Sequence, residues 1–218
     1  MINAETNNNL LIQMEKTFFF VHDATYNKEV DFKNDFKKLN KIYFDIFCSY
    51  YYSFSNLVSS GHYSPAIVIL RSMLEIHIKA VYVELIEKPK NTQVSDILDG
   101  VIKFPSFYQM ADILDKYMMQ STPEAEGAYM QFTKRNLAQY NKFSYFVHGN
   151  GEFIKQMFDN GKFGFSHESI KDILCSAKGL FETFSLFYFG VQGQMENHKK
   201  LAEIINNGQY KQQKNHKN

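Results

Sequence analysis

Hydrophobic residues are densest in one stretch near the middle of the chain, residues 64–87. Ser64 and Pro65 suit a helix N-cap and first helical position, and the following twenty residues contain no Gly or Pro. The stretch is apolar on nearly every side, which is typical of a helix with other helices packed around it. The pattern therefore predicts a central buried helix over about residues 64–87.

Other stretches have apolar residues at every third or fourth position, which is typical of helices that bury one face. The predicted helices span residues 10–21, 31–60, 94–101, 105–119, 123–147 and 166–193. Gly61 and Gly149 suit the residue just past a helix end, and Ser166 suits an N-cap.

The segment before the last long helix has a different pattern. Asn160 and Gly161 lie between two short apolar runs, which is a hairpin signal without clean alternation. A small hairpin near residues 152–166 and an irregular loop are equally good interpretations.

No repeat and no long linker divides the chain. The helices predict an all-α fold, a single bundle of five to seven helices around the central buried helix. The bundle forms one domain over residues 1–208, and a disordered polar tail covers residues 209–218.

Composition limits the function classes. A 44% hydrophobic and 16% aromatic content is ample for a core, and a net charge of +1 argues against a strongly electrostatic nucleic-acid binder. Cys48 and Cys175 form no paired motif, which favours the reducing cytoplasm. No signal peptide and no apolar run of roughly 18 residues is present. We expect a soluble, cytoplasmic protein without membrane contact.

The central helix also carries charged residues, including Arg71 and Glu75. An unpaired buried charge would cost several kcal/mol, so we expect partners for them. At about 100° per residue Glu75 lies about 40° from Arg71, which predicts an ion pair one turn apart. His77 lies about 120° from Arg71 and roughly 9 Å along the axis, on the face of Leu70 and Met73. His77 is therefore either a core histidine or part of a site that needs a bent helix.

Familiar catalytic and metal-binding motifs are missing from the sequence. It has no Gly-rich phosphate loop, no Gly-x-Ser-x-Gly elbow, no carboxylate and His spacing of di-iron bundles, and no two histidines four apart. The sequence therefore predicts neither a metal site nor a cofactor.

Two motifs resemble a known family. Arg71 and His77 have five residues between them within Leu70-Arg71-Ser72-Met73-Leu74-Glu75-Ile76-His77, and Ser144-Tyr145-Phe146-Val147-His148-Gly149 follows much later. Together they resemble the HEPN superfamily, all-α domains in which an Arg and a His separated by about four to six residues mark the RNases. The resemblance covers about residues 30–190. The second motif is similar to that of bacterial members of the family, whose function is largely unassigned.

The resemblance implies catalytic roles for Arg71, His77 and His148. It implies a metal-independent RNase or nucleotide-acting protein of a toxin, defence or stress system, with RNA or a nucleotide as ligand. A homodimer and a partner protein such as an antitoxin are also implied.

The residues themselves leave alternatives open. Ser144 and Asn141 share a helix face with His148 and would support it, since four positions rotate about 400°. His148 is either a C-capping histidine or meets Arg71 and Glu75 across the core. The alternative function is a non-catalytic interaction protein whose Arg, Glu and His residues only fix the packing.

Overall fold

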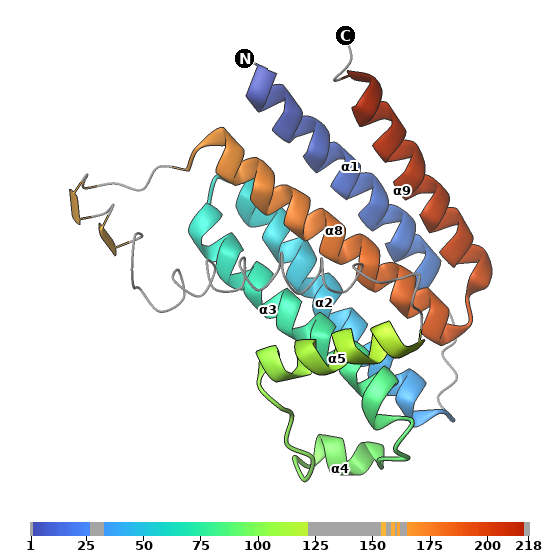
Figure 1. Ribbon diagram of the computed structural model, residues 1–218. Helices are drawn as coiled ribbons and strands as arrows, with labels where there is room; N and C mark the ends of the chain where they lie inside the picture. The colour runs from blue at the N-terminus through green and yellow to red at the C-terminus, as the bar shows by residue number, and fades with distance from the viewer. Residues whose placement is uncertain are drawn as a thin grey trace. The chain divides into compact units, whose positions relative to one another are not determined.

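The computed structural model describes residues 2–26, 33–121, 154–155, 158–159, 161 and 165–215 (Figure 1). This part of the chain contains seven α-helices and one π-helical turn, and none of its residues lies in a strand. The predicted all-α fold is confirmed. Within the same residues no helix is both long enough and apolar enough to cross a membrane.

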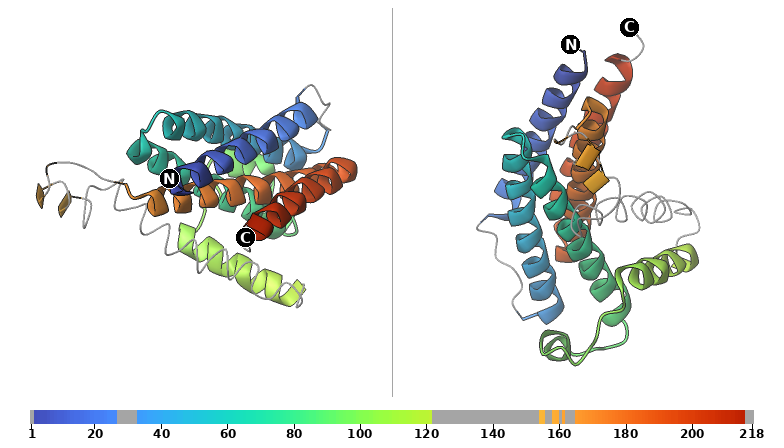
Figure 2. Two further views of the ribbon diagram at one scale, coloured as in Figure 1. Left: turned by 90° about the horizontal axis from the view of Figure 1, so that it is seen from above. Right: turned by 90° about the vertical axis from the view of Figure 1, so that its left-hand side faces the viewer.

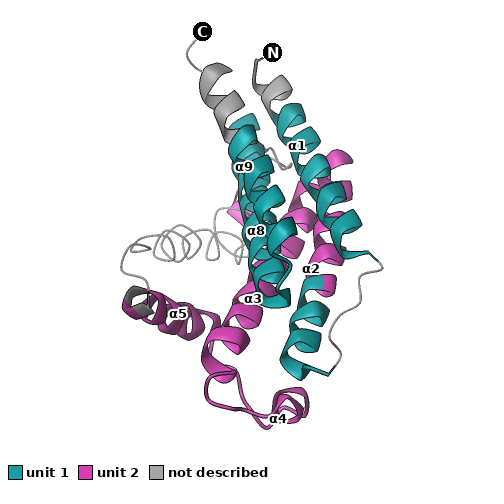
Figure 3. Cartoon of the chain, turned by 90° about the vertical axis from the view of Figure 1, so that its right-hand side faces the viewer, with its two compact units in different colours: residues 1–44, 165–218 teal, residues 45–164 magenta. Residues whose placement is uncertain are grey.

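The chain divides into two compact units, coloured separately in Figure 3. Unit 1 comprises Met1–Phe44 and Phe165–Asn218, and unit 2 comprises Asp45–Gly164. The long helix α2 (Asp35–Ser59) contributes to both. The single domain over residues 1–208 stays a prediction, and each unit is described by itself.

Unit 1 is built on three helices that pack pairwise and lie side by side in Figures 1 and 2: α1 (Ile2–Thr25), α8 (His167–Gln192) and α9 (Met195–Asn215). Aromatic contacts line the core of this unit. The Phe18 and Phe181 ring centroids lie 5.8 Å apart, and Phe44 stacks on Tyr188 at 4.0 Å. Helix α9 continues into residues 209–215, the start of the segment predicted to be a tail.

The start of α8 follows the predicted N-cap, and a glycine whose capping role was not predicted fixes its other end. The Ser166 hydroxyl accepts a hydrogen bond from the Ser169 N–H at 3.1 Å, which is an N-cap interaction. Gly193 has φ +74°, and the Gln194 N–H bonds back to the Phe189 carbonyl at 2.8 Å. This is a Schellman ending, which needs the left-handed conformation that glycine adopts without strain.

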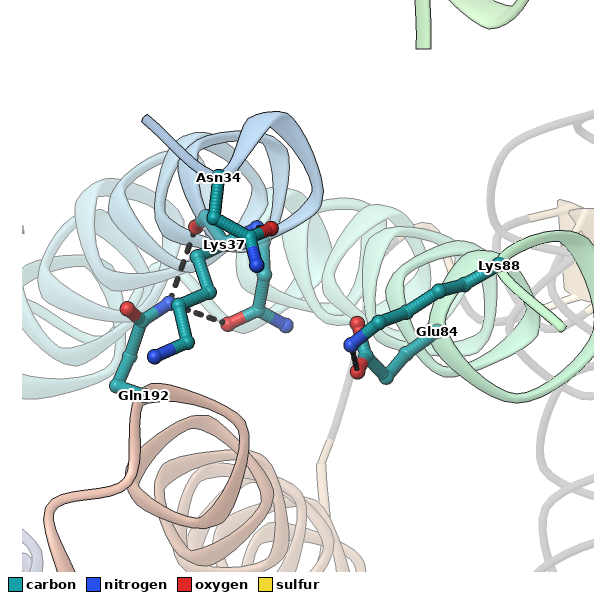
Figure 4. A network of polar contacts seen from close by, with 6 residues as sticks. Asn34, Lys37, Glu84, Lys88 and Gln192 are labelled. Atoms are coloured by element: carbon teal, nitrogen blue, oxygen red, sulfur yellow. Dashed lines mark hydrogen bonds and ion pairs between the residues drawn. The ribbon is translucent and has the colours of Figure 1, made fainter. Parts of the chain in front are cut away.

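The starts of α2 and of a later helix differ from the predictions. Helix α2 begins at Asp35 rather than residue 31, because the Asn34 side-chain oxygen accepts the Lys37 N–H at 3.1 Å (Figure 4). The α5 helix (Phe107–Ser121) begins two residues after Pro105. Ser106 and Gln109 form a reciprocal capping box there, with the Ser106 N–H 2.9 Å from the Gln109 side-chain oxygen.

Unit 2 contains the central helix, α3 (Tyr63–Tyr82), which continues into the π-helical turn η1 (Val83–Glu87). Only Pro65 and Val68 of α3 are exposed, so the predicted buried helix is confirmed. The short helix α4 (Val94–Leu98) follows, and α5 packs against α3.

The start of α3 corrects the predicted N-cap. The cap is His62, without a side-chain hydrogen bond, and the helix begins at Tyr63 rather than after Ser64. Pro65 is therefore the third helical residue, where its missing N–H would have had no acceptor within the helix. Gly61, with φ +77°, ends α2 as predicted, and the His62 N–H bonds to the Leu57 carbonyl at 2.7 Å.

Two predicted elements lie wholly or mostly outside the described residues. The predicted helix over residues 123–147 is one of them. Of the candidate hairpin at 152–166, the structure describes seven residues, of which 154–155 and 158–159 are helical and none is in a strand.

Candidate functional site

Arg71 and Glu75 form the ion pair predicted from their spacing on α3. The Arg71 Nη2 atom lies 3.1 Å from the Glu75 Oε1 atom. Their side chains are 20% and 34% exposed, so the expectation that the pair is buried is wrong. Water screens a pair of this kind, which places its contribution to stability at about 1 kcal/mol or less.

His77 lies on the buried face of the same helix. The residue is 1% exposed, and Leu70, Met73 and Leu74 on its face are buried as well. Burial penalises the charged imidazolium and lowers the pKa of His77 to about 3. His77 is therefore neutral at physiological pH, as expected for a core histidine.

The structure does not bring Arg71 and His77 together on α3. The helix is continuous from Tyr63 to Tyr82, and the π-helical turn begins at Val83, beyond both residues. Six positions of a regular helix leave them about 120° apart around the axis and roughly 9 Å apart along it. Arg71 is partly exposed, whereas His77 is buried.

The remaining predicted site residues, Asn141, Ser144 and His148, lie outside the described residues. Their proposed meeting with Arg71 and Glu75 stays a prediction.

A polar cluster around Glu87 was not anticipated from the sequence. The Glu87 carboxylate is buried in η1 and accepts hydrogen bonds from Lys90 Nζ at 2.9 Å and Thr92 Oγ1 at 2.8 Å. Backbone N–H groups of Lys90 and Thr92 bond to the Glu87 carbonyl at 3.2 and 3.3 Å. The cluster fastens the loop after the helix, residues 88–92, onto the last helical turn.

The charge state of Glu87 follows from these contacts. Burial by itself raises the pKa of Glu87, but the hydrogen bonds from Lys90 and Thr92 and the charge of Lys90 outweigh it, so the pKa is lowered. The hydrogen bond to Glu87 raises the pKa of Lys90. Both groups are charged at neutral pH and bond to each other, which suits a structural clasp better than acid–base chemistry. The neighbouring Lys88 pairs with Glu84 (Figure 4).

A second unanticipated feature is an ion pair on α8 in unit 1 whose carboxylate, on Glu182, is buried. Lys178 Nζ lies 2.6 Å from Glu182 Oε1, and their side chains are 14% and 10% exposed. Burial raises the pKa of Glu182, and the hydrogen bond and charge of Lys178 oppose that rise. The sequence signal is a Lys and a Glu four apart inside an apolar helix, which is the same signal as Arg71 and Glu75.

Unit 1 also contains a polar tie between distant parts of the sequence. The Gln192 side-chain amide donates to the Lys37 carbonyl at 3.0 Å and to Asn40 Oδ1 at 3.2 Å (Figure 4). This contact holds the end of α8 against the first part of α2. It joins backbone and amide groups and offers no reactive group.

Among the residues that the structure describes, the candidate site consists of Arg71 and Glu75 as a partly exposed charged pair, with His77 buried on a different face of the helix. Within the described residues, no group of three or more His, Cys, Asp or Glu side chains could hold a metal ion. No family model, curated protein or solved structure matches this chain.

Proposed function

We propose that this chain is a non-catalytic helical interaction protein in which Arg71, Glu75 and His77 fix the packing of α3. The observation that carries the proposal is the position of His77, which is 1% exposed in an unbroken helix. A general acid or base must reach the proton that it transfers, and His77 has no access to a substrate.

The protonation state of His77 supports the same conclusion. With a pKa of about 3, almost no imidazolium is present at neutral pH, so His77 could not act as an acid. As a base it would be weak, because effective catalytic groups have a pKa near the working pH.

Arg71 is also occupied. Its guanidinium contacts Glu75 at 3.1 Å, so an incoming phosphate would have to compete with a carboxylate held on the same helix. An arginine that stabilises a phosphate transition state works best when its charge is directed at the substrate.

A second candidate function is the metal-independent RNase that the HEPN resemblance implies. The observation in its favour is that the Arg71 side chain is not fully buried. In this candidate His148 is the acid or base, supported by Ser144 and Asn141, and the substrate is RNA or a nucleotide. A homodimer and an antitoxin-like partner protein belong to this candidate as well.

One experiment separates the two functions. Purified protein is incubated with single-stranded RNA in the presence of a chelator, alongside the variants Arg71→Ala, His77→Met and His148→Ala. The proposed function predicts intact RNA with every protein. Cleavage by the parent that disappears in Arg71→Ala and His148→Ala, but persists in the control Lys116→Ala, would establish the RNase instead.

A further inference from the structure

Helix α1 in unit 1 carries large hydrophobic side chains on its solvent face. Ile12, Phe19 and Tyr26, the last just beyond the helix end, are 40%, 55% and 65% exposed. They are spaced by seven residues, so at about 100° per residue they lie within roughly 40° of one another. We call this line of residues the α1 seam.

The α1 seam lies opposite the face that α1 buries. Leu10, Met14, Thr17 and Val21 are all buried. Their mean direction around the helix lies about 180° from that of the seam. A seven-residue spacing of apolar side chains on an outer face is the pattern with which one helix packs along another.

Charged and polar residues flank the α1 seam on both sides. Glu15 and His22 lie on one side, and Lys16 and Asp23 lie on the other; all four are exposed. The His22 ring stacks on Tyr26, with centroids 5.1 Å apart and an interplanar angle of 20°. The seam is therefore an apolar line with a polar rim, as is typical of a protein interface.

The flanks are complementary to a second copy of themselves. If two α1 helices pack antiparallel with Phe19 on the two-fold axis, the same flank of each helix faces its equivalent. Along the helix axis, Lys16 then lies within about 1.5 Å, the rise of one residue, of the second copy's Asp23. Glu15 lies within the same offset of the second copy's His22. Two-fold symmetry forms each of these pairs twice, and antiparallel helix dipoles attract.

We propose that this protein self-associates through an antiparallel pairing of α1 with α1 of a second copy, centred on Phe19. The proposal rests on the interaction role proposed above and adds a partner and a surface to it. Nucleic acid suits the seam less well, because Glu15 and Asp23 would repel phosphates beside Lys16. A single helix pair is a small interface, so the dimer dissociates on dilution.

The first test measures mass by light scattering over the micromolar range. We expect the parent to shift from 25.5 kDa toward twice that mass as its concentration rises. Phe19→Glu should stay monomeric at every concentration while keeping its helical circular dichroism, since Phe19 is a half-exposed side chain. The matched control is Tyr52→Glu, which replaces an exposed aromatic side chain on α2. This variant should dimerise like the parent. A monomeric parent, or a Phe19→Glu variant that still dimerises, overturns the proposal.

The second test addresses the antiparallel arrangement. Lys16→Glu should weaken dimerisation about tenfold, because it places like charges together twice. The double variant Lys16→Glu with Asp23→Lys should restore it, since each new Glu meets a new Lys. A double variant as weak as the single one overturns the arrangement.

The RNA assay keeps this inference separate from the proposed function. A parent that dimerises through α1 and also cleaves RNA would contradict the non-catalytic role and leave the dimer standing. A parent that is monomeric and leaves RNA intact would contradict the dimer and leave the non-catalytic role standing.

Discussion

The ammonium group of Lys178 lies 2.6 Å from the carboxylate of Glu182 one turn along α8, and both side chains are at least 86% buried. Arg71 and Glu75 have the same spacing on α3 but are more exposed, at 20% and 34%. Lys116 and Asp112 repeat the spacing on α5 at 68% and 62% exposure. These three pairs differ in solvation far more than in local geometry, and the difference leads to distinct expectations for their variants.

Replacing Lys178 by Ala should destabilise unit 1 strongly. Glu182 would be left as a buried carboxylate without its cation, for which we expect a loss of about 3 kcal/mol in the free energy of unfolding. Lys116→Ala is the matched control and should change that free energy by less than about 0.5 kcal/mol. Urea unfolding of both variants checks the difference. Equal effects of the two substitutions would show that Lys178 and Glu182 are solvated in the folded protein.

Replacing Arg71 by Ala should have a small effect. Glu75 is about one-third exposed and can be hydrated when its partner is removed, so we expect a loss of about 1 kcal/mol or less. The stability of Arg71→Ala is compared with that of Arg71→Lys, which keeps the charge. A loss of several kcal/mol for Arg71→Ala alone would show that the pair is buried in solution.

Stability should fall on acidification because of His77. Its pKa is about 3 in the folded protein, below the value of about 6.5 expected for an unfolded chain, so unfolding takes up a proton between these limits. The full stability is present above about pH 6.5 and is lost as pH falls toward 3, with a slope of up to about 1.4 kcal/mol per pH unit. His77→Met, an apolar side chain of similar length, should lose this part of the slope.

The measurement for His77 is urea unfolding of the parent and His77→Met between pH 7.5 and pH 5, a range chosen above the titration of most carboxylates. The difference between the two slopes isolates the histidine. Parallel pH profiles would mean that His77 reaches solvent in the folded state.

Glu87→Gln should loosen the segment after η1. The variant loses the charge that Lys90 and Thr92 contact, and we expect a local loss of about 1–3 kcal/mol. Hydrogen exchange of the Lys90 and Thr92 amides, which bond to the Glu87 carbonyl, should accelerate while that of Met73 stays unchanged. Glu84→Gln is the control, because Glu84 bonds to Lys88, which takes no part in the hydrogen bonds of the Glu87 carboxylate. Unchanged exchange in Glu87→Gln would show that backbone bonds alone hold the loop.

The same clasp has a pH dependence with a defined sign. The pKa of Glu87 is lowered in the folded protein, so its contribution is present above the pKa of an unfolded glutamate and is lost as pH falls through the folded value. Amide exchange of residues 88–92 therefore loses its protection in acid before that of the α3 interior.

Several helix ends could be predicted because they depend on neighbouring residues alone. Ser166 supplies an N-cap oxygen and Gly61 supplies a left-handed conformation, whatever surrounds them, and Gly193 could have been found by the same signal. The wrong N-cap, Ser64, has a local reason too: a Pro is tolerated anywhere in the first turn, so Pro65 did not identify the first helical residue. Ser106 and Gln109 could have been found as a capping box from their spacing.

The candidate site shows where local reasoning ends. Helix periodicity alone placed Arg71 beside Glu75 and placed His77 on the face of Leu70, and both relationships hold in the structure. Periodicity could not give solvent exposure. The sequence therefore determined which side chains share a turn of helix, whereas only the tertiary structure decided that Glu182 is buried and that Glu75 is partly exposed. Desolvation depends on atoms brought close by folding from distant parts of the chain, and these leave no mark in the spacing of two residues.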